Sequence, residues 1–258
     1  MTFPKILYLI VCFEKMIPKT EGIVLKSFDY RETSKIVTFF TKEYGKITGV
    51  MKGIRSDPKK FGSTVDKFTV NHIVYYHYKK SDLHLISQCD LKHFYFPIRQ
   101  NYKRNLAANY ALELVNTIMP VEEANDEIYQ LMLDYLDALQ TIEDIDKLVY
   151  ILQIKILLLS GFRPHLDACV VTGKKIEGKA RFSDRLGGLV APEVKTPETT
   201  FTIISKGTVS TILHVEKGSW KQCLRIGLSP TVRRELKFIL NNFLVYHLEK
   251  KLNTSKFL

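Results

Sequence analysis

The chain has 258 residues, which is enough for one large domain or for two or three smaller ones. A hydrophobic fraction of 45% and a charged fraction of 25% are ordinary for a soluble globular protein. The formal net charge of +11 is unusual. It indicates a polyanionic partner, because lysines and arginines that neutralise phosphates release counterions. A generally basic proteome is the alternative explanation.

The positive charge is concentrated at the two ends of the sequence. The net charge is +7 over residues 1–97, −4 over residues 98–165 and +8 over residues 166–258. A uniformly basic proteome does not explain an acidic middle. The distribution favours two basic surfaces joined by a neutral-to-acidic scaffold.

The N-terminal segment and the cysteines indicate where the protein works. The apolar run 6–13 is too short to span a bilayer and no small-residue cleavage site follows it, so we expect neither a membrane span nor a secretory signal. Residues 1–15 are interpreted as an upstream extension or a loosely attached tail, with a short edge strand as the alternative. The four cysteines are widely separated, which argues against a disulfide framework and fits a reducing cytosol; they are Cys12, Cys89, Cys169 and Cys223.

Residues 16–97 have the pattern of a small β-barrel. Alternating, β-branched and aromatic residues predict five strands joined by short polar or glycine-containing turns, over 21–28, 35–41, 47–51, 67–78 and 83–96. An OB-fold barrel is one structure that fits this pattern, and a five-stranded SH3-like barrel fits it equally well.

After Pro97 the hydrophobic period changes from two to about 3.6 residues, which predicts helices. We expect a helical domain over 98–165, with Asn125 as a helix N-cap and Gly161 as a C-cap. Residues 166–200 are rich in glycine and proline and predict a loop-rich insert with one hairpin. Residues 201–258 predict C-terminal helices that pack on the helical domain. The expected fold class is therefore α+β.

The first predicted barrel strands carry basic side chains interleaved with aromatic ones. Cations that follow phosphates and aromatic rings that stack on bases are the combination that holds single-stranded nucleic acid. The candidates for phosphate contacts are Lys26, Arg31, Lys35, Lys46, Lys52, Arg55, Lys59 and Lys60. The candidates for stacking are Tyr30, Tyr44 and Phe61, which lie near turns. A solvated, charged barrel surface is the alternative interpretation.

Motifs for catalysis and metal binding are missing from the sequence. It contains no Walker loop, GxGxxG, HExxH or GxSxG motif. Acidic pairs such as Glu122 and Glu123 lie at expected helix starts or connecting loops, where carboxylates interact favourably with the helix dipole. His72, His77 and His84 have no cysteine at ligand spacing, so we interpret them as surface positions of strands. We expect no catalytic residue, no metal and no cofactor.

Several stretches resemble the RecO family of bacterial recombination and repair mediators. Residues 20–55 resemble the N-terminal domain of that family, and residues 160–169 are similar to its G-[FY]-x-P-x-L-x-x-C element. Residues 182–188 are similar to the family's insert, and residues 246–258 to its C-terminal signature. The resemblance extends over about residues 16–258.

The resemblance implies an N-terminal OB-fold domain, a helical domain and, in many members, a four-cysteine zinc module. It implies a cytoplasmic, nucleoid-associated protein without catalytic activity that binds single- and double-stranded DNA and anneals complementary strands. It also implies work with RecR in loading recombinase onto DNA coated by single-strand-binding protein (SSB), and recognition of the acidic C-terminal tail of SSB. For that tail, Arg99, Lys103 and Arg104 are the candidate contacts.

The chain departs from the family at the zinc module. Cys169 remains, but Thr172, Ala191 and Val194 stand where the resemblance implies the other three cysteines. One thiolate does not close a tetrahedral structural site. We therefore expect a degenerate insert without zinc, held by apolar packing and backbone pairing.

Two other functions fit the same sequence features. An RNA-binding OB-fold accessory protein has the same basic and aromatic pattern, since the pattern does not separate DNA from RNA. A non-catalytic adaptor would bind partner proteins through its helices, and its basic surface would be incidental. A nuclease is a more distant alternative.

Overall fold

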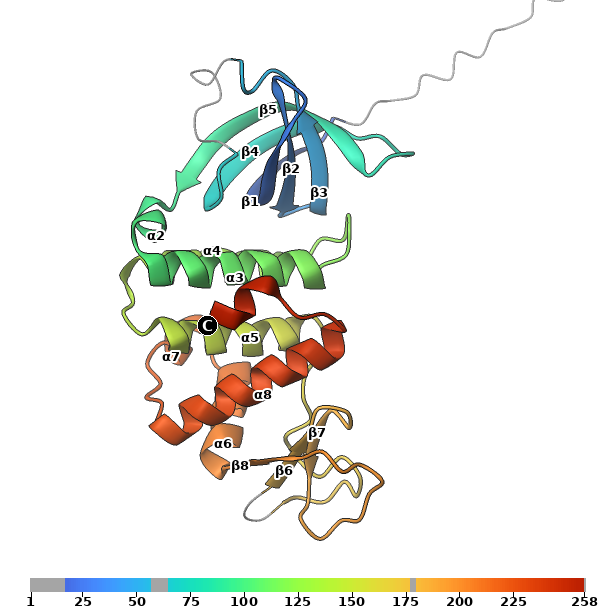
Figure 1. Cartoon of the computed structure of the whole chain (residues 1–258), viewed down its shortest axis with the longest axis vertical. Helices are drawn as coiled ribbons and strands as arrows, with labels where there is room; N and C mark the ends of the chain where they lie inside the picture. Colours follow the sequence, from blue (N-terminus) through green and yellow to red (C-terminus); the bar gives the residue numbers. More distant parts are fainter. Residues whose placement is uncertain (1–16, 57–64, 177–179, 258) are drawn as a thin grey trace, which may run out of the picture.

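The computed structural model describes residues 17–56, 65–176 and 180–257. A β-barrel, a group of helices and a small three-stranded sheet follow one another along the long axis of the molecule (Figure 1). The predicted N-terminal extension, residues 1–15, lies outside the described residues. No helix in the described part of the chain is both long and apolar enough to cross a membrane.

Five strands close the barrel in the order β1-β2-β3-β5-β4, with β1 also paired to β4. They are β1 (Lys19–Tyr30), β2 (Ser34–Thr41), β3 (Gly45–Met51), β4 (Thr69–Tyr76) and β5 (Leu83–Phe94). All pairs are antiparallel except β3 with β5, which are parallel. This closed, mixed barrel is the OB-fold that the sequence predicted, and its topology separates it from the SH3-like alternative.

Neighbouring residues of β2 connect the barrel to the helices. Phe39 points inward and packs with Val24, Ile47 and Tyr75 in the barrel core. Phe40 points outward and belongs to the large core shared with the helices, where its ring lies 5.9 Å from that of Tyr129. Because side chains alternate along a strand, one strand supplies both cores.

The helical region contains α2 (Phe96–Gln100), α3 (Tyr102–Ile118), α4 (Asp126–Thr141) and α5 (Ile145–Leu159), then α6 (Lys206–Lys217), α7 (Trp220–Cys223), α8 (Pro230–Leu248) and the 3₁₀ helix η1 (Asn253–Phe257). Asn125 caps α4 as predicted, with its side chain accepting from the amide of Ile128. The first predicted helix is split in two, because extended Asn101 ends α2 and caps α3.

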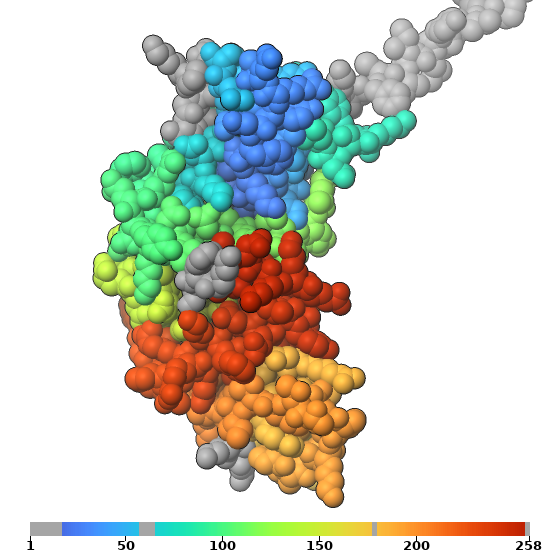
Figure 2. Space-filling model, in the orientation of Figure 1, coloured from blue at the N-terminus to red at the C-terminus, as the bar shows by residue number. Residues whose placement is uncertain are grey.

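The insert forms a sheet of order β7-β6-β8, with β6 (Ala180–Ser183), β7 (Gly188–Val190) and β8 (Thr202–Ile204). The β6–β7 pair is the predicted hairpin. The third strand lies beyond the predicted insert boundary at residue 200. Figure 2 shows the barrel and this sheet at opposite ends of the molecule, with the helical region between them.

Candidate nucleic-acid interface

The connection from β1 to β2 and the turn after β3 meet at one opening of the barrel, which we call the barrel mouth (residues 29–35 and 52–55). A groove of about 900 Å³ lies there, lined by residues 30–34 together with Val50, Lys52 and Leu83. OB-folds bind oligonucleotides across strands 2 and 3, between the loops that join strands 1–2 and 4–5. The groove therefore lies where this fold takes its ligands.

Arg55 joins the two segments of the barrel mouth. Its amide donates to the carbonyl of Thr33 (2.9 Å), and its Nη1 donates to the carbonyl of Arg31 (3.1 Å). Arg31 has a left-handed φ of 53°, and its guanidinium lies 5.1 Å from the ring centre of Tyr30. Lys52 is exposed in the turn that follows β3. Three cations and one aromatic ring thus share this opening.

Asp29 partly neutralises the barrel mouth. Its carboxylate accepts a hydrogen bond from Lys35 (2.8 Å) and lies 3.6 Å from Nη2 of Arg55. The hydrogen bond from Lys35, together with the charges of Lys35 and Arg55, lowers the pKa of Asp29. Asp29 is therefore ionised at neutral pH and competes with any phosphate for these two cations.

Two of the predicted contacts face the rest of the protein. Lys46 Nζ donates to the carbonyl of Asn116 in α3 (2.7 Å), and burial together with the charge of nearby Lys26 lowers its pKa. Tyr44 is half-buried, with its ring edge-on to Tyr75 at 6.0 Å. Lys46 links the barrel to the helices and Tyr44 packs at the edge of the barrel core, so both are engaged before any ligand binds.

The other predicted nucleic-acid contacts lie in different parts of the chain. The barrel mouth brings together Tyr30, Arg31, Lys35, Lys52 and Arg55. Lys26 is exposed on β1 beside Lys46 rather than at the mouth. Lys59, Lys60 and Phe61 lie outside the described residues.

The connection between β4 and β5 adds candidates that the sequence reasoning missed. Tyr78 is 40% exposed, and Lys79 and Lys80 are both exposed. This connection leads into Leu83, which lines the same groove as Arg31. The available signal was an aromatic residue at the end of the predicted strand 67–78 followed by two lysines. Recognising it required the strand order of the barrel.

The three cations proposed for partner binding all have acidic partners. Arg99 pairs with Asp66 (2.9 Å), and Lys103 pairs with Asp146 (3.3 Å). Arg104 pairs with Glu143 (2.9 Å) and also donates to the carbonyl of Gln140, and its side chain is only 13% exposed. Arg104 is thus a link between α3 and the end of α4.

The degenerate zinc positions come together around an apolar cluster. Cys169 is buried with Val190 and Ala191, and Val194 and Phe201 pack on them. The Cys169 sulfur accepts from the amide of Ala191 at 3.5 Å. Although burial raises the pKa of this thiol, hydrogen bonds from Thr172 and from backbone amides outweigh that effect and lower it to about 7.

An arginine completes the same turn. Nη2 of Arg181 donates to the carbonyls of Ala191 (3.0 Å) and Val194 (2.7 Å), and its guanidinium lies 4.4 Å from the ring centre of Phe201. Apolar packing and hydrogen bonds to the backbone thus hold the insert together. The absence of zinc stays a prediction.

A closed, mixed five-stranded barrel mounted on a helical region defines a protein of the OB-fold class. Two family models match the chain. The one described as Recombination protein O N terminal matches residues 16–95, and the one described as Recombination protein O C terminal matches residues 99–256. The chain belongs to the RecO family of DNA repair and recombination proteins.

Curated relatives cover nearly the whole chain. A DNA repair protein RecO of Desulfatibacillum aliphaticivorans is 31% identical over 93% of this chain and 95% of its own length. The proteins of the same name from Thermoanaerobacter sp. and Moorella thermoacetica are 30% and 28% identical, each over 93% of this chain and over 96% and 90% of their own lengths.

Proposed function

We propose that this protein is a non-catalytic mediator of DNA repair and homologous recombination. It binds single- and double-stranded DNA, anneals complementary strands and helps to load recombinase onto DNA coated by SSB. The observation that carries the proposal is the barrel mouth, where Tyr30, Arg31 and Lys52 line a groove at the ligand-binding position of an OB-fold, with Lys35 and Arg55 beside it on Asp29. In this proposal residues 16–97 contact DNA, and residues 98–258 support the barrel and bind partners.

This set of side chains suits annealing. Cations along a groove bind phosphates regardless of sequence, and rings such as half-buried Tyr30 and exposed Tyr78 stack on any base. Such contacts leave the hydrogen-bonding edges of the bases free to pair. They also reduce the repulsion between two polyanionic strands, which is the main barrier to bringing the strands together.

The partner-binding part of the proposal concerns RecR and the acidic tail of SSB. A peptide that ends in a carboxylate needs cations beside an apolar groove. A cavity of about 560 Å³ between α8 and η1 has Lys250 and Lys251 at its lining, with Leu244, Val245 and Leu252 as its apolar part. Because Arg99, Lys103 and Arg104 are already ion-paired, this cavity is the better candidate for the tail.

The test is an annealing assay on complementary labelled strands, naked or coated with SSB. We expect the protein to accelerate annealing of both substrates without nucleotide hydrolysis. Coating with SSB that lacks its last residues should remove the acceleration on coated strands only. No acceleration on either substrate would overturn the proposal, and partner binding without any annealing would favour an adaptor.

A competition experiment addresses the RNA-binding alternative. Single-stranded DNA and RNA of the same sequence are titrated against a labelled DNA complex at fixed salt. The proposal expects DNA to compete at least as well as RNA. Strong preference for RNA would favour the accessory-protein alternative.

A further inference from the structure

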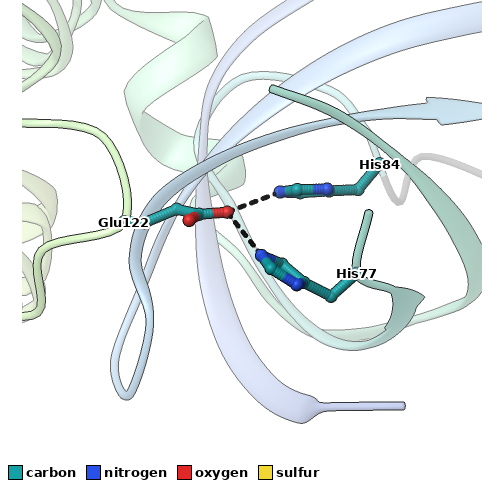
Figure 3. A group of neighbouring side chains, drawn as sticks. All are labelled: His77, His84 and Glu122. Carbon is teal, nitrogen blue, oxygen red and sulfur yellow. Dashed lines mark hydrogen bonds and ion pairs between the residues drawn. The ribbon is translucent and has the colours of Figure 1, made fainter. Parts of the chain in front are cut away.

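Two histidines and one glutamate converge at the junction between the barrel and the helices (Figure 3). His77 follows the last residue of β4, His84 is the second residue of β5, and Glu122 lies in the connection between α3 and α4. The Nε2 atoms of His77 and His84 lie 2.9 Å and 2.8 Å from the same Oε1 atom of Glu122. Two imidazole nitrogens and a carboxylate oxygen thus point to one place.

The backbone holds Glu122 over the histidines. The amide of Glu122 donates to the carbonyl of Lys46 (3.0 Å), next to a bridge between Lys46 and Val121. Gly45 permits this close approach, since a Cβ there would lie 2.1 Å from the carbonyl oxygen of Glu123. Glu122 itself has a left-handed φ of 56°, which a non-glycine residue keeps only where its surroundings impose it. The carboxylate is therefore positioned by the packing of its loop on β3.

We propose that His77, His84 and Glu122 bind a divalent transition metal ion, Zn²⁺, with a fourth coordination position open to water. Two histidines and one glutamate are a known three-residue ligand set of open zinc sites, and imidazole nitrogen favours zinc over magnesium or calcium. His84 is 1% exposed, whereas His77 and Glu122 are 20% and 43% exposed, so the ion has a fixed anchor and a route of entry.

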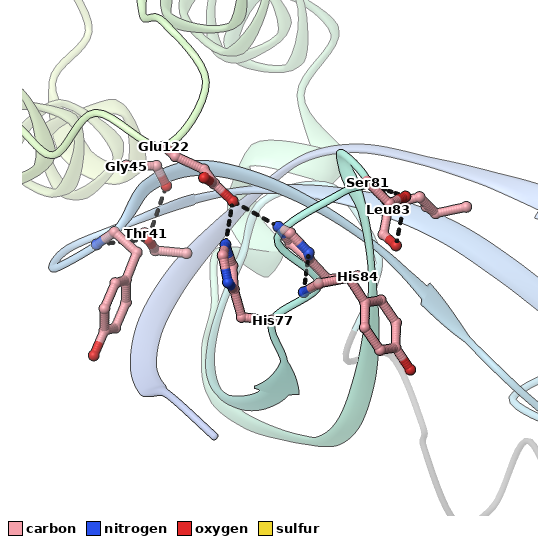
Figure 4. Close-up of polar contacts among 9 residues, drawn as sticks. Thr41, Gly45, His77, Ser81, Leu83, His84 and Glu122 are labelled. Carbon is pink, nitrogen blue, oxygen red and sulfur yellow. Dashed lines mark hydrogen bonds and ion pairs between the residues drawn. The ribbon is translucent and has the colours of Figure 1, made fainter. Parts of the chain in front are cut away.

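Binding requires small changes from the metal-free arrangement. The amide of Tyr78 donates to Nδ1 of His84 at 3.3 Å, so Nε2 carries the hydrogen that is donated to Glu122 (Figure 4). With zinc bound at Nε2, the hydrogen of the neutral imidazole moves to Nδ1. The amide of Tyr78 then no longer donates to Nδ1, and this long hydrogen bond is lost. The nitrogen–oxygen separations widen to about 3.3 Å, as metal–ligand bonds of about 2.0–2.1 Å at tetrahedral angles require. The two histidine nitrogens, which lie within 4.8 Å of each other, come to a similar separation.

The ion would link two parts of the chain that are far apart in sequence. His77 and His84 enclose the β4–β5 connection, in which Ser81 and Leu83 hydrogen-bond to each other (Figure 4). Glu122 comes from the helical region, 38 residues after His84. Zinc would fix the base of this connection to the helices. Fixing this connection would also restrain Tyr78, Lys79 and Lys80 for contacts with DNA. That consequence rests on the proposed function, whereas the metal site itself does not.

The site differs from the degenerate zinc module around Cys169, and a substitution in each separates them. Glu122→Gln keeps the size and a hydrogen-bond acceptor but replaces the charged ligand. His84→Ala removes the buried ligand. Cys169→Ser is the matched control, because it removes the thiol of the distant insert.

The experiment titrates Zn²⁺, and Co²⁺ as a spectroscopic probe, into chelator-treated full-length protein, using calorimetry and visible absorption. We expect one equivalent bound by wild type and by Cys169→Ser, and at least tenfold weaker binding by Glu122→Gln and His84→Ala. Circular dichroism checks folding, and the exposed Glu122 keeps the test decisive if the His84 variant does not fold. Absence of binding to wild type, equal binding by Glu122→Gln, or loss of binding in Cys169→Ser would each overturn the proposal.

Discussion

The cations of the barrel mouth and those of the helical region differ in what they contact. In the helical region, Lys155 donates to the carbonyls of Glu216 (3.2 Å) and Gly218 (2.6 Å) at the end of α6, and Lys147 donates to that of Leu224 (2.9 Å) at the end of α7. Arg104 does the same for Gln140 near the end of α4. At the barrel mouth, Lys52 makes no hydrogen bond or ion pair within the described residues.

The contrast shows that two regions with similar net charge can differ in how many of their cations are available to bind phosphate groups. The last carbonyls of a helix have no partner within it, and a cation there satisfies them and favours the helix dipole. Such cations stabilise the fold and are not free for phosphates. The two ends of the sequence carry net charges of +7 and +8. At the barrel mouth, Arg31 and Lys52 line a groove together with Glu32, while Asp29 pairs with Lys35 and Arg55 beside it.

The largest expected effect is on DNA binding by the barrel mouth. The double substitution Lys52→Glu with Arg55→Glu should weaken binding of single-stranded DNA on the order of 100-fold at low salt, and should reduce the slope of log K against log salt by about two. Fluorescence anisotropy over a salt series measures both quantities.

The matched control for this variant is Lys174→Glu with Lys175→Glu. Both lysines are exposed on the insert, at the opposite end of the molecule from the barrel. The control makes the same change in net charge and should leave binding nearly unchanged. If the barrel-mouth variant bound as tightly as wild type, the assignment of the interface would be wrong.

The next effect concerns stability. Arg104→Ala removes a largely buried guanidinium from Gln140 and Glu143 and leaves a carbonyl unpaired, which should lower the free energy of unfolding by about 1–3 kcal/mol. DNA binding and SSB-tail binding should not change. Urea denaturation measures the loss, and Arg99→Ala, in an exposed pair with Asp66, should cost only about 0–1 kcal/mol. If the Arg104→Ala variant kept its stability but lost binding of the SSB tail, Arg104 would be a partner contact after all.

Local patterns in the sequence predicted most of the fold. The β-branched and aromatic runs gave five strands, and apolar stripes with capping residues such as Asn125 gave the helices. These features depend on interactions between residues close in sequence. The break at Asn101 was missed because the apolar period continues through it, and only its extended backbone shows that a new helix begins.

The candidate site was harder to predict, because its details depend on contacts between distant residues. Lys46 looked like a phosphate contact until Asn116, 70 residues later, was seen to accept its hydrogen bond. Tyr44 looked like a stacking ring, but it is half-buried and makes an edge-on contact with the ring of Tyr75. Glu122 looked like an ordinary carboxylate at a helix start or in a connecting loop, and only the fold places it over His77 and His84. No periodicity in the sequence carries that information.

The smallest expected effect is on DNA affinity when the carboxylate that neutralises two cations of the barrel mouth is removed. Asp29→Asn removes the carboxylate that pairs with Lys35 and Arg55, and it keeps the size of the side chain. DNA binding should become about threefold tighter, with a steeper salt dependence, because both cations become free for phosphates. Glu32→Gln, which makes the same charge change in the same loop at a residue without an ion pair among the described residues, is the control. If the two variants tightened binding equally, net charge alone would explain the effect; a larger gain for Asp29→Asn would show that pairing with Asp29 holds these cations back from DNA.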